Sequence, residues 1–162
     1  MSLNALVPVL GKSNRSAGQA LVEFTLVFLL FLVVAWIPAD FGLAFYTGQL
    51  AQNASREGAR IAAADRNLLS GTTSCTMPSC SGNIFTETAA RISSALLPGA
   101  TITLSLDADT GANCNRMVAV TVSGTYNFFF YQLLRWFGVS TNLNNTVITR
   151  QTRMRWEAQA GC

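Results

Sequence analysis

Residues 18–37 have the sequence GQALVEFTLVFLLFLVVAWI, in which Glu23 is the one charged side chain. An apolar run of about 20 residues is long enough to cross a bilayer as a helix. A carboxylate in such a run costs roughly 2.5–3.5 kcal/mol on insertion scales, so acidic groups there usually face a partner and carry a function. The sequence therefore predicts a membrane helix with a functional carboxylate at Glu23.

The charges around this run predict its orientation. Lys12 and Arg15 precede it, and no further basic residue follows until Arg56. Because positive charge stays on the cytoplasmic side, we expect the C-terminal portion to lie outside the cytoplasm. The alternative is a cleaved secretory signal, but the sequence WIPAD at residues 36–40 is a poor small-x-small cleavage site. We therefore favour a retained anchor.

The helical pattern continues beyond the apolar run to about Asp65. Very small residues recur there at intervals of three and four, which places them on one helical face. These residues are Ala44, Gly48, Ala51, Ser55, Gly58 and Ala62. A stripe of this kind lets two backbones approach closely. It predicts helix packing through Gly48–Ala62, either against the chain's own domain or against other subunits.

The rest of the chain indicates a small α+β domain. Residues 69–83 have the composition of a loop, and an apolar face of Phe85, Ala89, Ile92 and Leu96 predicts a further helix, ended by Pro98 and Gly99. Alternating apolar and polar residues predict strands at 101–106, 117–125 and about 146–156. We expect these three strands to form an antiparallel sheet, with the helices covering its apolar face.

The segment 128–137 has the sequence FFFYQLLRWF, which is too short to span a bilayer. It is either a connection buried on the domain's own core or an exposed aromatic patch on a membrane or a neighbouring subunit, since large exposed apolar patches mark interaction sites.

The four cysteines, Cys75, Cys80, Cys114 and Cys162, all follow the apolar run. An even number in this position favours disulfides in an oxidising compartment. Their spacing does not fit a zinc site, which needs two short pairs. We expect Cys75 to pair with Cys80 and Cys114 with Cys162, although four cysteines allow three connectivities.

The composition argues against several classes of protein. The net charge is +3, and the basic residues are scattered, so nothing indicates nucleic-acid binding. The sequence contains no histidine, the commonest general base and metal ligand. The remaining candidates for an enzyme, Glu87, Asp107 and Asp109, form no recognisable catalytic arrangement. We expect no enzymatic activity, no cofactor and no metal.

Several of these residues together resemble the TadE-like family, pilin-related proteins of tight-adherence (Tad, or Flp) pili. The resemblance lies in GQALVEF at residues 18–24, in DFG at residues 40–42 with Tyr46, and in NASREGAR at residues 53–60. It covers about the first third of the chain, and the remainder is compatible with it.

The resemblance implies that a prepilin peptidase cuts between Gly18 and Gln19, which leaves Glu23 as the fifth residue of the mature protein. In pilins that glutamate is thought to neutralise the N-terminal amine of an adjacent subunit, and two charges in hydrocarbon are tolerable as a pair and costly apart. The partners implied are the peptidase, the membrane and other pilin subunits, contacted through the N-terminal helix. An outer domain larger than that of the small major pilins favours a minor pilin or pseudopilin.

The expected organisation is a basic leader at 1–18, a pilin-like helix at 19–66 that spans the membrane to about residue 43, and an extracytoplasmic α+β domain at 67–162. This makes the chain a single-pass protein of the cytoplasmic membrane that assembles into, or primes, an adhesive filament. The competing hypothesis is a membrane-anchored protein that displays a ligand-binding domain. That hypothesis predicts no cut after Gly18 and no effect of replacing Glu23 by alanine.

Overall fold

The computed structural model describes residues 15–108, 115–136, 138 and 144–158. The chain divides into two units, residues 1–38 and residues 39–162. Helix α1 (Arg15–Ala64) begins in the first unit and continues through Pro38 into the second.

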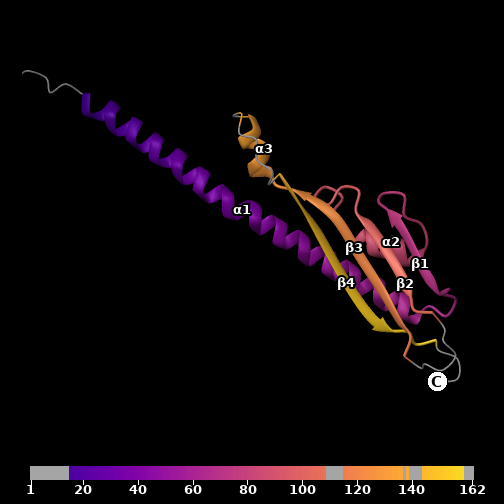
Figure 1. Cartoon of the computed structure of the whole chain (residues 1–162). Helices are drawn as coiled ribbons and strands as arrows, with labels where there is room; N and C mark the ends of the chain where they lie inside the picture. The colour runs from indigo at the N-terminus through magenta and orange to yellow at the C-terminus, as the bar shows by residue number, and fades with distance from the viewer. Residues whose placement is uncertain (1–14, 109–114, 137, 139–143, 159–162) are drawn as a thin grey trace, which may run out of the picture. The chain divides into compact units, whose positions relative to one another are not determined.

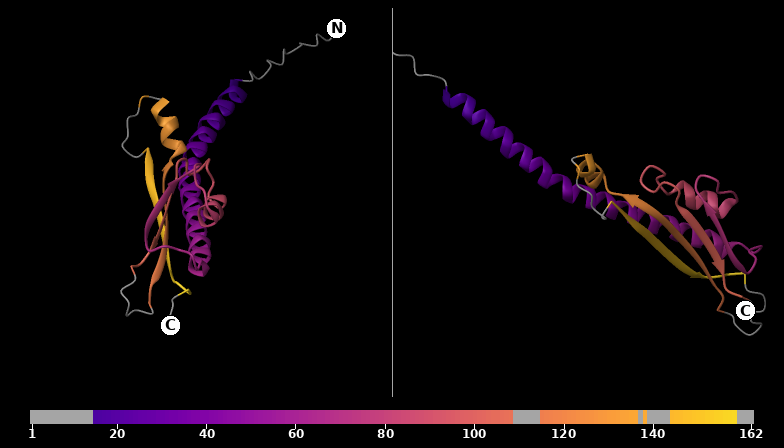
Figure 2. Two further views of the ribbon diagram at one scale, coloured as in Figure 1. Left: turned by 90° about the vertical axis from the view of Figure 1, so that its right-hand side faces the viewer. Right: turned by 45° about the horizontal axis from the view of Figure 1, so that its top comes forward.

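The second unit contains one antiparallel sheet, with the strand order β1-β2-β3-β4. Its strands are β1 (Gly71–Thr76), β2 (Thr101–Leu106), β3 (Met117–Asn127) and β4 (Asn145–Arg155). Two short helices accompany them, α2 (Asn83–Ala90) and α3 (Phe129–Trp136). Residues 39–64 of α1 and helix α2 cover the same face of the sheet (Figures 1 and 2). The expected α+β fold is therefore confirmed.

Apolar and polar residues alternate along the two central strands, β2 and β3, and this alternation determines which face of the sheet forms the core. Ile102, Leu104 and Leu106 of β2 are buried, and so are Val118, Val120 and Val122 of β3. The register brings these two sets together, since Ile102 lies opposite Val122 and Leu106 opposite Val118. Alternate side chains point to opposite faces of a strand, so the intervening Thr and Ser residues lie on the outer face. There Ser123 and Thr149 hydrogen-bond at 2.9 Å across β3 and β4.

The second half of α1 and strand β4 match in length. Twenty-six helical residues, Ala39 to Ala64, rise about 40 Å, and the eleven residues of β4 extend about 36 Å. Polar contacts join the two along this length. Gln52 and Ser55 both hydrogen-bond to the hydroxyl of Thr152, at 3.1 and 2.8 Å. Beyond the end of β4, the indole of Trp156 donates a 2.8 Å hydrogen bond to the carbonyl of Asp65.

The structure refines the sequence interpretation. The sheet contains a fourth strand, β1, which lies in the segment interpreted as a loop. The second helix ends at Ala90; Ile92 still packs into the core from the turns that follow. The aromatic segment forms α3, in which the Trp136 side chain is 89% exposed, whereas the preceding Phe128 is buried.

Candidate functional site

Glu23 lies on an exposed apolar surface in the first unit. Its neighbours on α1, from Leu21 to Phe31, are exposed large apolar side chains. The helix Gly18–Ala64 is the one helix in the described residues that is long and apolar enough to cross a membrane. The amide of Gln19 donates a 3.3 Å hydrogen bond to the Glu23 carboxylate. That amide is neutral, so it offers no charge to balance the carboxylate in hydrocarbon.

Gly18 and Gln19, the residues of the expected cleavage site, are exposed in the first turns of α1. No heavy atom lies within 4 Å of the position that a Cβ on Gly18 would occupy. The basic residue Lys12 lies outside the described residues.

The stripe of small residues faces the chain's own sheet. Gly48, Ala51, Ser55, Gly58 and Ala62 are all buried. A Cβ on Gly58 would collide with the hydroxyl of Thr88 in α2 and would lie 3.1 Å from Val120 of β3. The stripe is therefore the surface on which α1 approaches the sheet and α2 within one chain, which is the first of the two kinds of packing considered from the sequence.

A buried carboxylate at the start of the second unit was not assigned a role from the sequence. Asp40 is 3% exposed. The phenol of Tyr126, near the end of β3, donates a 3.1 Å hydrogen bond to Asp40 Oδ1. The backbone N–H of Phe130 donates a 2.7 Å hydrogen bond to Asp40 Oδ2. One carboxylate thus joins α1, β3 and α3.

The contact with Phe130 explains why α3 begins where it does. The first N–H groups of a helix have no partner within the helix. A carboxylate that accepts one of them also interacts favourably with the positive end of the helix dipole. Burial, followed by the hydrogen bond to Asp40 and the charge of that carboxylate, raises the pKa of Tyr126 to about 12. The phenol is therefore a hydrogen-bond donor at every physiological pH.

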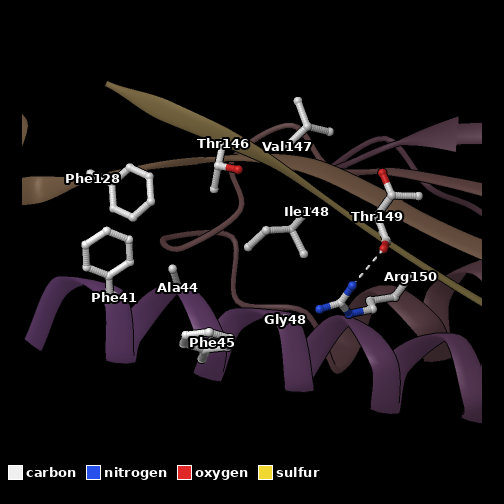
Figure 3. Close-up of a pocket in the computed structure, with 10 residues that line it drawn as sticks. All are labelled: Phe41, Ala44, Phe45, Gly48, Phe128, Thr146, Val147, Ile148, Thr149 and Arg150. Carbon is white, nitrogen blue, oxygen red and sulfur yellow. Dashed lines mark hydrogen bonds between the residues drawn. The ribbon is translucent and has the colours of Figure 1, made fainter. Parts of the chain in front are cut away.

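An apolar groove lies beside this carboxylate, between α1 and the edge strand β4 (Figure 3). Its volume is about 430 Å³. Phe41, Ala44, Phe45 and Gly48 form the α1 side, and Phe128 with residues 146–150 forms the other. The guanidinium of Arg150 reaches over Gly48, where a Cβ would lie 3.2 Å from Nη2. The rings of Phe41 and Phe128 close one end, with their centroids 5.4 Å apart.

The structure describes two of the four cysteines, Cys75 and Cys80. Cys75, in β1, forms a disulfide with Cys80, as expected from the sequence. Cys114 and Cys162 lie outside the described residues. Within the described ranges, no group of three or more His, Cys, Asp or Glu side chains is placed to hold a metal ion.

Comparison with known proteins supports the resemblance that the N-terminal motifs suggest. Residues 18–60 match the family model of TadE-like proteins. The TadE-like match begins at Gly18 and includes Glu23, Asp40 and most of the small stripe. No match was found among curated proteins or among solved structures. The matched segment thus contains the apolar run and most of the part of α1 that packs on the sheet.

Proposed function

We propose that this chain is a TadE-like minor pilin, or pseudopilin, of a Tad/Flp-type pilus, inserted in the membrane and assembled into or priming the filament. The observation that carries the proposal is the family match itself. It starts at Gly18 and places Glu23 five residues further on, inside a helix suited to hydrocarbon.

The chemistry of assembly follows from this position. A cut after Gly18 creates a positively charged amine on Gln19, at the start of an apolar helix. That amine and the Glu23 carboxylate are each costly in hydrocarbon and tolerable together. Pairing the amine of one subunit with Glu23 of the next therefore favours association of helices within the membrane. The hydrogen bond from the Gln19 amide keeps Glu23 oriented but leaves its charge available.

The unit outside the apolar segment supports a minor role. It spans residues 39–162 and contains a four-stranded sheet with its own core. Such a subunit would add a folded domain at the tip or base of a filament made mainly of small pilins. The same N-terminal helix would hold it there.

The Glu23→Ala variant tests the charge pair. We expect it to insert in the membrane as the parent chain does, because removing the carboxylate favours insertion. Its recovery in sheared pili, relative to the membrane fraction, should fall by roughly tenfold, the equivalent of about 1.4 kcal/mol.

Thr25→Ala provides the matched control. Thr25 is the next polar side chain in the run, and its hydroxyl donates to the carbonyl of Leu21 in the same helix. Its removal should leave recovery in pili unchanged. Equal recovery of the Glu23→Ala chain and the parent chain would contradict the charge pair and favour an anchored protein that only displays its domain.

A further inference from the structure

The exposed aromatic residues of the second unit gather at one end. They are Phe41, Phe45 and Tyr46 on α1, and Phe129 and Trp136 on α3. We call these five residues the aromatic collar. Their exposed fractions run from 44% for Phe41 to 89% for Trp136. Away from this end, Leu69 is the exposed large apolar side chain of the described part of the unit. Apolar patches of this kind mark interaction sites.

The position of the collar along the chain is fixed by Asp40. Asp40 follows the apolar run after Pro38 and Ala39, close to the expected end of the membrane span at about residue 43. Its carboxylate holds the N–H of Phe130 at 2.7 Å, which ties the first turn of α3 to this level. An eight-residue helix rises only about 12 Å. All of α3 therefore lies near Asp40, at the start of the sheet unit's part of α1.

The exposed charges described at this end are basic. Of the five arginines between Asp109 and Glu157, three lie toward the Trp156 end of the sheet, namely Arg116, Arg153 and Arg155. Arg135, in the last turn of α3, and Arg150, beside the groove, are both exposed. Among the residues that the structure describes, the carboxylate of Asp40 also lies at this end, but it is buried and accepts hydrogen bonds from Tyr126 and Phe130. The surface therefore presents aromatic rings and guanidinium groups together.

We propose that the aromatic collar lies in the headgroup region of the bilayer that holds the apolar helix, with α3 as a short interfacial helix. Tryptophan and tyrosine rings accumulate at that depth, and aromatic helices with basic residues bind the surface of anionic bilayers. Arg135 then contacts lipid phosphates. The inference rests on the membrane anchorage of the chain and not on its assembly into a pilus.

Fluorescence quenching by brominated lipids tests the contact. The full chain carries Trp36 in the apolar run, Trp136 in the collar and Trp156 at the opposite end of the sheet. In a Trp36→Phe background, one copy is placed in each lipid nanodisc containing phosphatidylglycerol. Lipids brominated just below the headgroup should lower the emission of Trp136 by roughly twofold. The matched control Trp36→Phe/Trp136→Phe retains only Trp156 and should show no quenching.

Two outcomes would overturn the proposal. One is quenching of Trp136 no stronger than that of Trp156. The other is protection of Trp136 from a water-soluble quencher only when several copies share a disc, which would assign the collar to contacts between copies. Quenching of Trp36 in a Trp136→Phe chain measures anchorage separately, so failure of anchorage and failure of the collar contact are distinguishable. Because Trp136 is 89% exposed, its replacement by Phe leaves the core intact.

Discussion

The Tyr126 hydroxyl donates a 3.1 Å hydrogen bond to the Asp40 carboxylate across 86 residues of sequence. This contact joins the end of β3 to the point where α1 enters the sheet unit. With the Phe130 N–H on the other carboxylate oxygen, it makes Asp40 the residue that holds α1, β3 and α3 together. Within the sheet unit, these contacts therefore tie the first residues of its part of α1 to β3 and α3.

Replacing Asp40 by alanine should destabilise the sheet unit by about 2–4 kcal/mol, because a buried hydroxyl and a buried N–H each lose their acceptor. Chemical unfolding of the full chain in detergent, followed by near-UV circular dichroism, measures the effect. Asp65→Ala serves as the control, since the hydrogen bond that the Asp65 carboxylate accepts within the described residues, from the N–H of Asn67, is exposed. A loss equal to that of Asp65→Ala would show that the Asp40 contacts contribute nothing.

The raised pKa of Tyr126 predicts a dependence of stability on alkaline pH. The folded chain keeps the phenol proton to about pH 12, whereas the unfolded chain releases it near 10. Between these values the folded state binds more protons than the unfolded state. The contribution of Tyr126 to the free energy of unfolding is therefore fully present below pH 10 and is lost as pH rises toward 12. Tyr126→Phe should lack this part of the decline. In the folded parent chain, absorbance at 295 nm should show an ionisation near pH 12 that is absent from Tyr126→Phe.

The sequence predicted the parts of the fold whose side chains alternate or repeat along the chain. Strands β2, β3 and β4 were predicted because their apolar residues alternate, as in ITL and VAVTV at residues 102–104 and 118–122. Strand β1, GTTSCT, was missed because it is an edge strand that buries almost nothing, so its Thr and Ser residues resemble those of a loop.

The Asp40 site was not predictable from local pattern. Its partners, Tyr126 and Phe130, are 86 and 90 residues away, and the carboxylate appears in the sequence only as a charge near the end of an apolar run. The stripe of small residues, by contrast, is a clear local pattern whose packing partner the sequence does not identify. Its spacing predicts a face for close packing but does not specify what packs there. The same spacing serves a neighbouring helix or, as here at Gly58, a sheet and a second helix of the same chain.

Gly58→Ala tests that close approach. The added methyl group would collide with Thr88 and lie 3.1 Å from Val120, so the substitution should cost about 1–3 kcal/mol despite the better helix propensity of alanine. Gly42→Ala is the matched control, because Gly42 lies on the same helix with no atom within 4 Å of the added group. It should be neutral or slightly stabilising. Thermal unfolding of both variants in detergent gives the comparison, and equal midpoints would refute the packing argument.

The disulfide between Cys75 and Cys80 should stabilise the edge of the sheet locally. A loop this short contributes about 2 kcal/mol in the chain-entropy description. In the Cys75→Ser/Cys80→Ser chain, hydrogen exchange of β1 should accelerate, while the amides of β3 keep their protection because their partners on β2 and β4 are unchanged. Equal acceleration of exchange in β1 and β3 would instead show that the disulfide stabilises the whole domain and not β1 alone.

The proposed charge pair between subunits depends on a new amine at Gln19. Sequencing the N-terminus of the protein recovered from assembled pili measures this directly. The account predicts a first residue of Gln19, with Glu23 in fifth place. Recovery of the chain from working pili with residues 1–18 still attached would contradict it.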